Sequence, residues 1–578
     1  MQTTTAETVF LAQVGEAADR HVAAFLAKDD GGVPGLAHRP AMARLLDLVT
    51  VFTQPGSRFF LREGFGEAMT QCLDRLEVLQ GPTGLFDGTN LCSPPDSAFT
   101  LNDVCLALRL VRGLDGDQFP GDDPLLREVD GRLAAFIGRS IEAMVAGGVH
   151  TPNHRWELCA ALAQINLLQP RQDIGVRIGQ WLAEGIDQLP DGMYSERSPL
   201  YATAVTNPSL LTIADSAGRP ELLDHVRRNL TAFLPWFNPD GTVESVFSRR
   251  QDQWMRFGAA PFLHLYRRFA IQDGRADFAA AAAWLASFPL QEPAKLLALT
   301  RLDPWLAGAL PPVPPSDAGF SLPLPHAQAE AALESCGAFR FRSGGSVATV
   351  FGGCDPLVPG IGSGLATNPT FLSFRHGEAV LSDVRLSRSF FDLGPFRSQA
   401  TSRRDRSVVL SEEVQAGFYQ PLPPERLRAD GIYPLEHEGR FSAAMGFSAR
   451  AADVHRLATG MTVTVEDGQV CLDACFDGTR TAFALEITFR PGGVLDGVEP
   501  ATAPGTFRLV DGTGSYRMGR DVIEFGPGLP PDPDAPAVYN PGESYRYLGG
   551  TNAADGVKVY ITGWTTGRYL FTFQGSTA

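Results

Sequence analysis

The spacing of apolar residues changes once along this chain, and that change most constrains the fold. From about residue 5 to about residue 308, apolar residues recur three and four positions apart, for example in 42–52, 97–114 and 124–147. This period is typical of amphipathic helices, and the short loops rich in Pro, Gly and Asp between them favour antiparallel hairpins. The first part of the chain therefore predicts an all-α array of about ten to twelve helices.

A second pattern begins after a proline-rich segment. Short runs that alternate or are rich in β-branched residues follow it, such as 346–353 and 557–564, with Gly, Asp and Pro between them. Such runs predict antiparallel strands. We expect a multidomain chain, α then β, with a helical domain at 1–308, a stiff linker at 309–329 and an antiparallel β-sandwich domain at 330–578.

The composition is that of a folded, acidic protein. Hydrophobic residues make up 44% of the chain, and the formal net charge is -16. This charge opposes binding to nucleic acid or anionic membranes, so an anionic ligand requires a local group of arginines. No apolar run predicts a membrane span, and the N-terminus lacks the features of a signal peptide. We therefore expect a cytoplasmic protein.

Few motifs for metals or cofactors are present. The eight cysteines are scattered, and only Cys471 and Cys475 lie close together, without the second pair or the histidines of a zinc site. The chain also lacks the patterns GxGxxG, HExxH and GxSxG and a Walker-type loop. We expect reduced structural thiols, no cofactor and no metal at the functional site.

Three polar residues precede an apolar run at 156–168. Asn153 is a good N-cap after Pro152, so the helix is predicted to start near His154. One interpretation is structural: Asn153 caps the helix, His154 packs and Arg155 pairs with a neighbour. The other is that a buried helix holds these groups rigidly, as a binding site requires.

Two further polar segments can join this site. The segment 189–211 carries Tyr194, Glu196, Arg197 and Tyr201 around a Gly turn and a Ser-Pro helix start. Alternate loops of an antiparallel helical array fall at the same end, so this segment can face the Asn-His pair across one opening.

The third polar segment, 244–254, brings Arg249 and Arg250 together just before another predicted helix. These arginines either form ordinary ion pairs in a solvated loop or hold an acidic ligand by forked, charge-assisted hydrogen bonds. The second interpretation would supply the local positive charge that an acidic protein needs for an anionic ligand.

These features together resemble the heparinase II/III-like polysaccharide lyases, including the oligoalginate lyase branch. The resemblance rests on the α-then-β order, on Asn-His at a helix start and on DGMYSERSPLY about 40 residues later. It implies an incomplete (α/α) toroid whose cleft is closed by a β-sandwich. It also implies cleavage of a uronate-containing glycan by β-elimination, which requires no cofactor.

The resemblance implies roles for four residues. Asn153 matches the asparagine that neutralises the uronate carboxylate, and Tyr201 matches the tyrosine that acts as general acid and in some members also as base. His154 matches a histidine that can take the proton, and Glu196 a supporting acidic position. These residue types suit the chemistry, because the enolate that forms needs donors aimed at the carboxylate and a group that moves the proton.

The β-domain departs from the family pattern. Members commonly carry an HxHxDxLSF-like segment, whose histidine enters the site or binds a structural metal. Here LSF is kept, but Ala366, Asn368 and Thr370 stand where His, His and Asp are expected. Asn368 and the nearby His376 remain as substrate-binding candidates, and a metal is not supported.

Three functions remain open from the sequence. The first is a lyase that acts on imported oligosaccharides, in an exo mode, for example at a rhamnosyl-glucuronate end. The second is a glycoside hydrolase on an α-toroid, which needs placed carboxylates such as Glu157, Asp191, Glu196 or Asp252. The third is a glycan-binding protein without activity. The oligomeric state, including a homo-oligomer, is not readable from the sequence.

Overall fold

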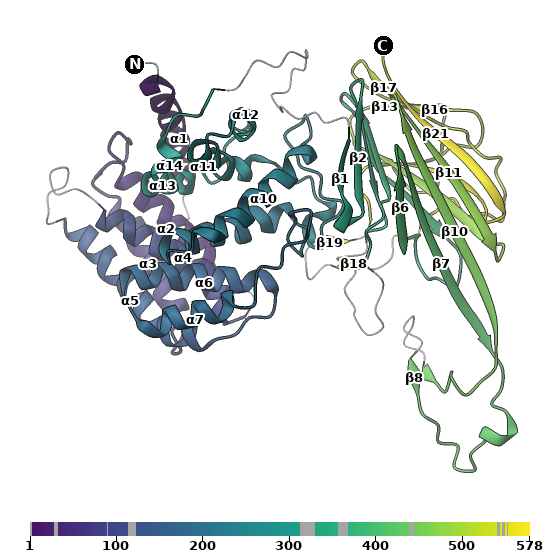
Figure 1. Cartoon of the computed structure of the whole chain (residues 1–578), viewed down its shortest axis with the longest axis horizontal. Helices are drawn as coiled ribbons and strands as arrows, with labels where there is room; N and C mark the ends of the chain where they lie inside the picture. The colour runs from purple at the N-terminus through teal and green to yellow at the C-terminus, as the bar shows by residue number, and fades with distance from the viewer. Residues whose placement is uncertain are drawn as a thin grey trace. The chain divides into compact units, whose positions relative to one another are not determined.

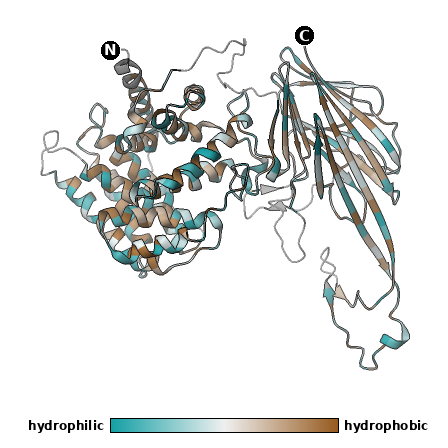
Figure 2. Cartoon of the chain, in the orientation of Figure 1, coloured by the Kyte–Doolittle hydropathy of each residue, from teal (hydrophilic) through white to brown (hydrophobic). Residues whose placement is uncertain are grey.

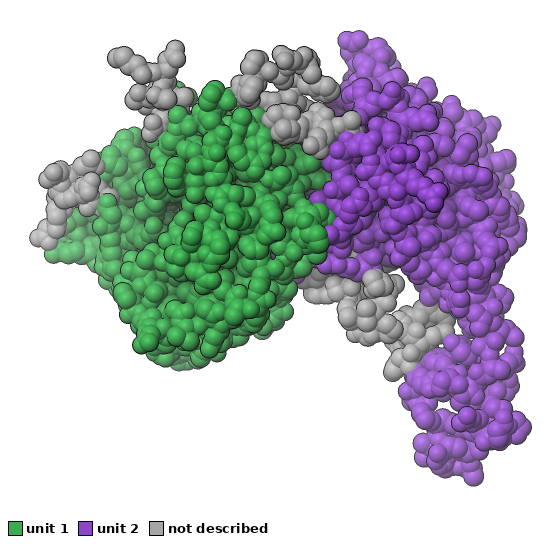
Figure 3. Space-filling model, viewed as in Figure 1, with its two compact units in different colours: residues 1–195, 199–243, 257–326 green, residues 196–198, 244–256, 327–578 purple. Residues whose placement is uncertain are grey.

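The computed structural model divides the chain into two compact units (Figures 1 and 3). Unit 1 comprises residues 1–195, 199–243 and 257–326, and unit 2 comprises residues 196–198, 244–256 and 327–578. The structure describes residues 3–27, 33–88, 91–113, 123–312, 330–355, 368–437, 444–539, 544–545, 550–551 and 553–578.

Unit 1 is helical, as its apolar period predicts. Its α-helices are α1 (Thr3–Leu26), α2 (His38–Phe52), α3 (Gly66–Leu79), α4 (Pro94–Arg112), α5 (Pro124–Ala146), α6 (Pro152–Leu168), α7 (Gln172–Leu182), α8 (Pro199–Tyr201), α9 (Asn207–Ser216), α10 (Leu223–Phe233), α11 (Leu263–Asp273), α12 (Ala276–Leu285), α13 (Pro293–Leu302) and α14 (Pro304–Ala307).

The helices of unit 1 form a curved array. Neighbours along the chain pack together, as α2 does with α3 and α11 with α12, while α1 packs against the late helix α13. Most helices carry hydrophobic and hydrophilic residues side by side (Figure 2). Helix α6 differs, because its residues from Trp156 to Ile165 are all buried. A helix buried on all sides lies inside the array and is held from several directions.

The start of α6 corrects the predicted cap. Thr151 has the extended backbone of an N-cap residue, and Pro152 follows at the first helical position. Proline suits that position because its missing N–H has no partner there. Asn153 therefore lies inside the first turn, and the prediction that it caps the helix is wrong.

Unit 2 is built from strands. They are β1 (Glu330–Leu333), β2 (Ala338–Ser343), β3 (Ser346–Phe351), β4 (Leu372–His376), β5 (Ala379–Arg388), β6 (Ala400–Arg404), β7 (Ser407–Tyr419), β8 (Glu436–His437), β9 (Ala444–Met445), β10 (Ala452–Glu466), β11 (Gln469–Gly478), β12 (Ala482–Phe489), β13 (Val494–Asp496), β14 (Glu499–Pro500), β15 (Thr506–Arg508), β16 (Gly514–Met518), β17 (Asp521–Gly526), β18 (Ser544–Tyr545), β19 (Gly550–Thr551), β20 (Val557–Trp564) and β21 (Gly567–Thr577).

Two large sheets pack face to face in unit 2. Among the described residues, one sheet has the order β1-β2-β3-β4-β5-β12-β20-β15-β14 and the other β13-β16-β17-β21-β11-β10-β7-β6. The pairs are antiparallel except for β15 with β20. One continuous core contains side chains of both sheets, such as Leu386 and Leu485 from the first and Val463 and Phe571 from the second. This arrangement is a β-sandwich.

The unit boundaries differ from the predicted domains in two places. Residues 196–198 and 244–256, predicted in the helical domain, cluster with unit 2. The proposed linker lies mostly outside the described residues. All eight cysteines are free thiols. Across the described ranges, no helix has the length and hydrophobicity needed to cross a membrane.

Candidate active site

The first turn of α6 holds a buried amide with spare hydrogen-bonding capacity. The Asn153 side chain is 2% exposed. Its Oδ1 accepts a hydrogen bond from Thr151 Oγ1 at 2.6 Å. Its Nδ2 is buried and has no hydrogen-bond partner within the described part of the chain. A buried donor without an acceptor is unfavourable and rare, so this nitrogen is well suited to a ligand that brings an acceptor.

The next residue, His154, belongs to a row of rings that ends at a cation. The His154 ring meets the His150 ring edge-on, with centroids 4.7 Å apart, and meets the Phe99 ring edge-on at 6.2 Å. The guanidinium of Arg39 lies over the Phe99 ring, 3.8 Å from its centroid. Helices α2, α4 and α6 thus bring Arg39, Phe99 and His154 together.

Arg39 is a residue that the sequence analysis missed. It forms an ion pair with Asp96, and Asp96 also receives His38 Nε2 at 3.1 Å. Burial and the charge of Arg39 lower the pKa of His38 to about 4, so this imidazole is neutral. Its Nδ1 then accepts from Thr100 Oγ1 at 2.6 Å, which leaves Nε2–H to donate to Asp96. No local motif marks Arg39, because its neighbours come from another helix.

Tyr201 lies next to an unusual helical turn. It ends α8 and directly precedes a π-helical turn, η1 (Ala202–Thr206), which leads into α9. Pro208 in the first turn of α9 lacks an N–H, which is consistent with the widened turn. The π turn packs against α6, and the Tyr201 side chain is half-buried. Single π turns often occur at functional sites.

Electrostatics place Tyr201 near the same cation. Burial lowers the pKa of Arg39, while charge interactions with Glu157 and Tyr201 raise it. The π turn after Tyr201 packs against α6, and Glu157 on α6 is bonded to α4 and α9. Arg39, Glu157 and Tyr201 therefore belong to the same part of unit 1 as the first turn of α6.

Glu157 lies one turn after Asn153 on α6 and is fully engaged. Its carboxylate accepts from Asn102 Nδ2 at 2.7 Å and from Ser209 Oγ at 2.9 Å, and Gln164 Nε2 donates to Asn102 Oδ1 at 2.8 Å. Burial raises the pKa of Glu157 to about 7. This network ties α4 and α9 to α6 beneath the first turn.

The DGM segment is held by a chain of hydrogen bonds that includes Tyr194. Gly192 has φ +94°, and a Cβ there would lie 2.7 Å from the Arg228 carbonyl oxygen. Asn229 donates to the Gly192 carbonyl at 3.1 Å, Asn207 donates to Asn229 at 2.9 Å, and the Tyr194 hydroxyl donates to Asn207 at 2.7 Å. Tyr194 is buried, and its hydroxyl helps to hold this segment in place. These contacts do not support a role for Tyr194 in substrate binding.

Arg155 forms ion pairs with its neighbours, as the structural interpretation of the sequence predicts. Its guanidinium contacts Glu184 at 2.7 Å and Asp187 at 3.2 Å, and it lies over the Trp156 ring. Asp187 also accepts from the Trp156 indole N–H at 3.1 Å. These contacts direct Arg155 to the loop after α7, so they do not support a role in substrate binding.

The remaining arginines and Glu196 lie in unit 2. Arg197 has a left-handed backbone, φ 53°, and donates to the carbonyl of Gly353 at 2.8 Å. Arg249 pairs with Asp355 at 2.6 Å, and Arg250 pairs with Glu196 at 3.5 Å. A non-glycine residue with positive φ is strained and often occurs at a functional segment. The structure thus groups Glu196, Arg197, Arg249 and Arg250.

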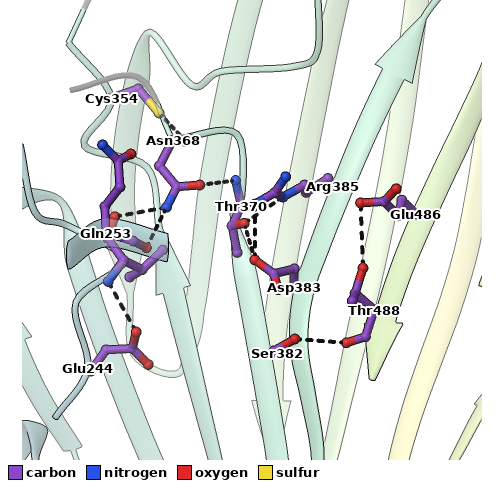
Figure 4. A network of polar contacts seen from close by, with 11 residues as sticks. Glu244, Gln253, Cys354, Asn368, Thr370, Ser382, Asp383, Arg385, Glu486 and Thr488 are labelled. Atoms are coloured by element: carbon purple, nitrogen blue, oxygen red, sulfur yellow. Dashed lines mark hydrogen bonds and ion pairs between the residues drawn. The ribbon is translucent and has the colours of Figure 1, made fainter. Parts of the chain in front are cut away.

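Asn368, at the position of the expected β-domain histidine, has a structural role. Its Nδ2 donates to the backbone carbonyls of Gln253 at 3.3 Å and Val246 at 3.5 Å, and its Oδ1 accepts from the Thr370 N–H at 3.0 Å (Figure 4). The side chain is 5% exposed. Asn368 therefore fastens the 244–256 loop to the start of β4, and its contacts do not support substrate binding.

His376 is also enclosed, at the end of β4. Its Nδ1 contacts Ser346 Oγ at 2.8 Å and its Nε2 contacts Thr577 Oγ1 at 2.9 Å. These bonds do not support its role as a substitute for the lost histidine. Ala366 lies outside the described residues. Within the ranges described above, the structure contains no group of three or more His, Cys, Asp or Glu side chains that could hold a metal.

Comparisons with known proteins now give the fold its context. No protein-family model matches the sequence, and no curated protein matches it significantly. The structure is similar to that of a solved heparinase III. The alignment covers 93% of this chain and 78% of the heparinase chain, with a TM-score of 0.51 and 12% identity. The chondroitin AC lyase of Streptomyces coelicolor A3, solved with chondroitin sulphate, aligns with 98% and 79%, with a TM-score of 0.52 and 14% identity.

The chain has a polysaccharide lyase fold. The predicted class, an incomplete (α/α) toroid followed by a β-sandwich, is therefore confirmed. The resemblance to the heparinase II/III-like lyases is confirmed at the level of the fold. Because identity is low, the roles of individual residues rest on the geometry of this chain.

Proposed function

We propose that the protein is a polysaccharide lyase that cleaves a uronate-containing glycan by β-elimination. The observation that carries this proposal is the buried Asn153 amide, whose Nδ2 has no acceptor among the described residues, on a rigid helix against which the turn after Tyr201 packs. A uronate carboxylate would supply that acceptor. The polysaccharide lyase fold supports the same reaction.

In the proposed mechanism, Asn153 binds the substrate carboxylate and Tyr201 transfers the proton. Asn153 Nδ2 donates to the substrate carboxylate and stabilises the negative charge that builds up on it. Tyr201, as phenolate, takes the proton from C5, and the electron pair of that bond moves toward the carboxyl group. The C4–O bond then breaks, a C4=C5 double bond forms, and the Tyr201 hydroxyl returns the proton to the leaving oxygen. Tyr201 thus both takes and returns the proton, so the step needs no other proton donor.

His154 remains a second candidate in this mechanism. Its ring lies between those of His150 and Phe99, next in the chain to the carboxylate-binding amide. It can take the C5 proton when the substrate presents that proton on the face away from Tyr201. The configuration of the preferred uronate at C5 therefore decides whether His154 or Tyr201 is the base.

Three of the four carboxylates considered for a hydrolase are held by hydrogen bonds or ion pairs. Glu157 accepts from two side chains, Asp252 is fully buried and accepts from Ser198 at 2.8 Å, and Glu196 pairs with Arg250. A glycosidase needs one carboxyl free to donate a proton and another free to attack or to activate water. These contacts favour the lyase over the hydrolase.

The finer features of the function stay proposals. We propose that the substrates are oligosaccharides, that cleavage is exo, for example at a rhamnosyl-glucuronate end, and that the enzyme acts in the cytoplasm. Product sizes over time test the mode, because an exo enzyme releases one small product from the start. Sedimentation tests whether the protein is a homo-oligomer.

A panel of uronate glycans tests the proposed function. The lyase produces 4,5-unsaturated uronates, whose ultraviolet absorbance rises during the reaction, whereas a hydrolase releases saturated reducing ends. Tyr201→Phe keeps the ring and loses the hydroxyl, so we expect turnover to fall by about 10²–10⁴-fold with the fold intact. Tyr194→Phe is the matched control and should keep its turnover.

Two outcomes contradict the proposal. Saturated products from every active glycan would identify a hydrolase. Binding of a uronate glycan without any product would identify a glycan-binding protein. Full activity of Tyr201→Phe would remove Tyr201 from the mechanism and leave His154 as the proton-transfer candidate.

A further inference from the structure

Arg39 is held in one orientation by a single face of α4. Its Nη2 pairs with Asp96, and its guanidinium plane lies over Phe99. Residues three apart on a helix lie on the same side, so Asp96 and Phe99 form one platform. His38 donates to Asp96 from Nε2 and is itself bonded to Thr100. The guanidinium is therefore fixed before any ligand arrives.

Arg39 also keeps capacity for a ligand. Its Nε is buried and has no hydrogen-bond partner among the residues that the structure describes. The side chain as a whole is 38% exposed. The protein carries a net charge of -16, and Arg39 supplies positive charge at this position.

The position of Arg39 relates it to the proposed site. The Phe99 ring under its guanidinium contacts the His154 ring, and His154 follows Asn153, whose Nδ2 is also a buried donor without an acceptor among the described residues. Arg39 also has a charge interaction with Tyr201, and the turn after Tyr201 packs against α6. Helices α2 and α6 thus present two unsatisfied donors around one histidine, near the proposed proton-transfer residue.

We propose that Arg39 binds the carboxylate of the uronate that is cleaved, as the cationic partner of Asn153. This proposal rests on the proposed lyase function and names a residue that determines its specificity for acidic sugars. A planar guanidinium offers parallel N–H donors that match the two oxygens of a carboxylate. Negative charge on that carboxylate grows as the C5 proton leaves, so a fixed cation stabilises the transition state more than the bound substrate.

The test pairs a change in the enzyme with a change in the substrate. Arg39→Gln and Arg39→Lys are compared with wild type on a glycan that is turned over and on the same glycan with methyl-esterified carboxyl groups. We expect Arg39→Gln to lower kcat/KM on the acid form by about 10²-fold, mostly through kcat, and to change it little on the ester. Arg39→Lys should recover part of the loss, because it keeps the charge and loses the fork.

A matched control comes from the same helix. Arg44 also lies on α2, and its guanidinium is over the ring of Phe25, 5.1 Å from its centroid. Arg44→Gln should leave the ratio of acid to ester turnover unchanged. Equal losses of Arg39→Gln on acid and ester would show a structural role and overturn the proposal, as would full activity on the acid form. Thermal unfolding of each variant checks that it is folded.

A binding experiment separates this proposal from the proposed function. Calorimetry measures the binding of a saturated uronate oligosaccharide to Tyr201→Phe, with and without Arg39→Gln. We expect Arg39→Gln to weaken binding of the acid oligosaccharide by about threefold and that of its methyl ester little. If no glycan yields an unsaturated product but this difference persists, the lyase function fails and the carboxylate site stands. If binding is independent of Arg39, the carboxylate site fails whatever the reaction is.

Discussion

Asn153 and Asn368 stand at the two positions where the sequence pattern places substrate contacts, one in each unit. Both side chains are buried, 2% and 5% exposed. Asn368 Nδ2 donates to the carbonyls of Gln253 and Val246, and its Oδ1 accepts from the Thr370 N–H. The Asn153 side chain accepts a hydrogen bond from Thr151, and its Nδ2 has no acceptor in the described part of the chain. Residue type and burial are alike, and only the unused donor distinguishes the two.

The same difference separates two arginines of unit 1. Arg155 places its guanidinium against Glu184 and Asp187, and these contacts account for its position. Arg39 pairs with Asp96 but keeps a buried Nε without a partner among the described residues. A folded chain satisfies nearly all of its buried polar groups, so an open donor beside the proposed site is a place where a ligand can complete the bonding.

The largest expected effect is the loss of activity in Asn153→Ala. This change removes a donor that acts on the growing charge, so we expect kcat to fall by about 10²–10³-fold. Stability should change little, because the lost amide has one bond to a side chain. Initial rates and urea unfolding measure both. A variant that unfolds readily yet keeps its kcat would show that Asn153 resembles Asn368 after all.

The next largest effect is a pH dependence of stability caused by Glu157, whose carboxylate accepts two hydrogen bonds. Its pKa in the folded protein is about 7, raised by burial above the ordinary value of 4.5. The folded state therefore favours the protonated form, and its contribution to stability is complete below about pH 4.5 and is lost as the pH rises through 7. The loss is about 3 kcal/mol at pH 8.

Urea unfolding between about pH 4.5 and 8 measures this loss, with Glu157→Gln as the reference that does not ionise. The free energy of unfolding of wild type should fall relative to that of Glu157→Gln as the pH rises. Asn102→Ala removes a donor to the ionised carboxylate, so the fall should shift to higher pH. A constant difference between wild type and Glu157→Gln would mean that this carboxyl does not titrate in the range.

Asn368→Ala should give the reverse of the Asn153 result. Its removal leaves two carbonyls and one N–H of buried loops without this partner, which costs about 2 kcal/mol of stability. We expect kcat per folded molecule to remain within about threefold of wild type, since no substrate contact is lost. Unfolding of unit 2 and active-site titration measure the two quantities. A large loss of kcat with unchanged stability would return Asn368 to the substrate site.

The smallest effect is expected for Arg155→Gln. Its partner Glu184 is 49% exposed, and ion pairs of this kind contribute about 0–1 kcal/mol. Both kcat and KM should stay close to those of wild type. A rise in KM for the acid glycan that is absent for its methyl ester would show that Arg155 binds the carboxylate, which would weaken the distinction from Arg39.

The sequence by itself determined the class of the fold. A period of three and four residues before about residue 308 and short alternating runs after about residue 330 sufficed for helices followed by a β-sandwich, because the period of burial follows from local backbone geometry. The motifs around Asn153 and Tyr201 also pointed to a polysaccharide lyase fold, which the solved structures confirm.

Only the tertiary structure decided which polar groups remain open. Arg39 stands far from Asn153 in the sequence, and its platform of Asp96 and Phe99 belongs to another helix. Asn368 is closed by carbonyls of the distant 244–256 loop. A hydrogen bond depends on which groups folding brings within about 3 Å of each other, and no local pattern carries that information.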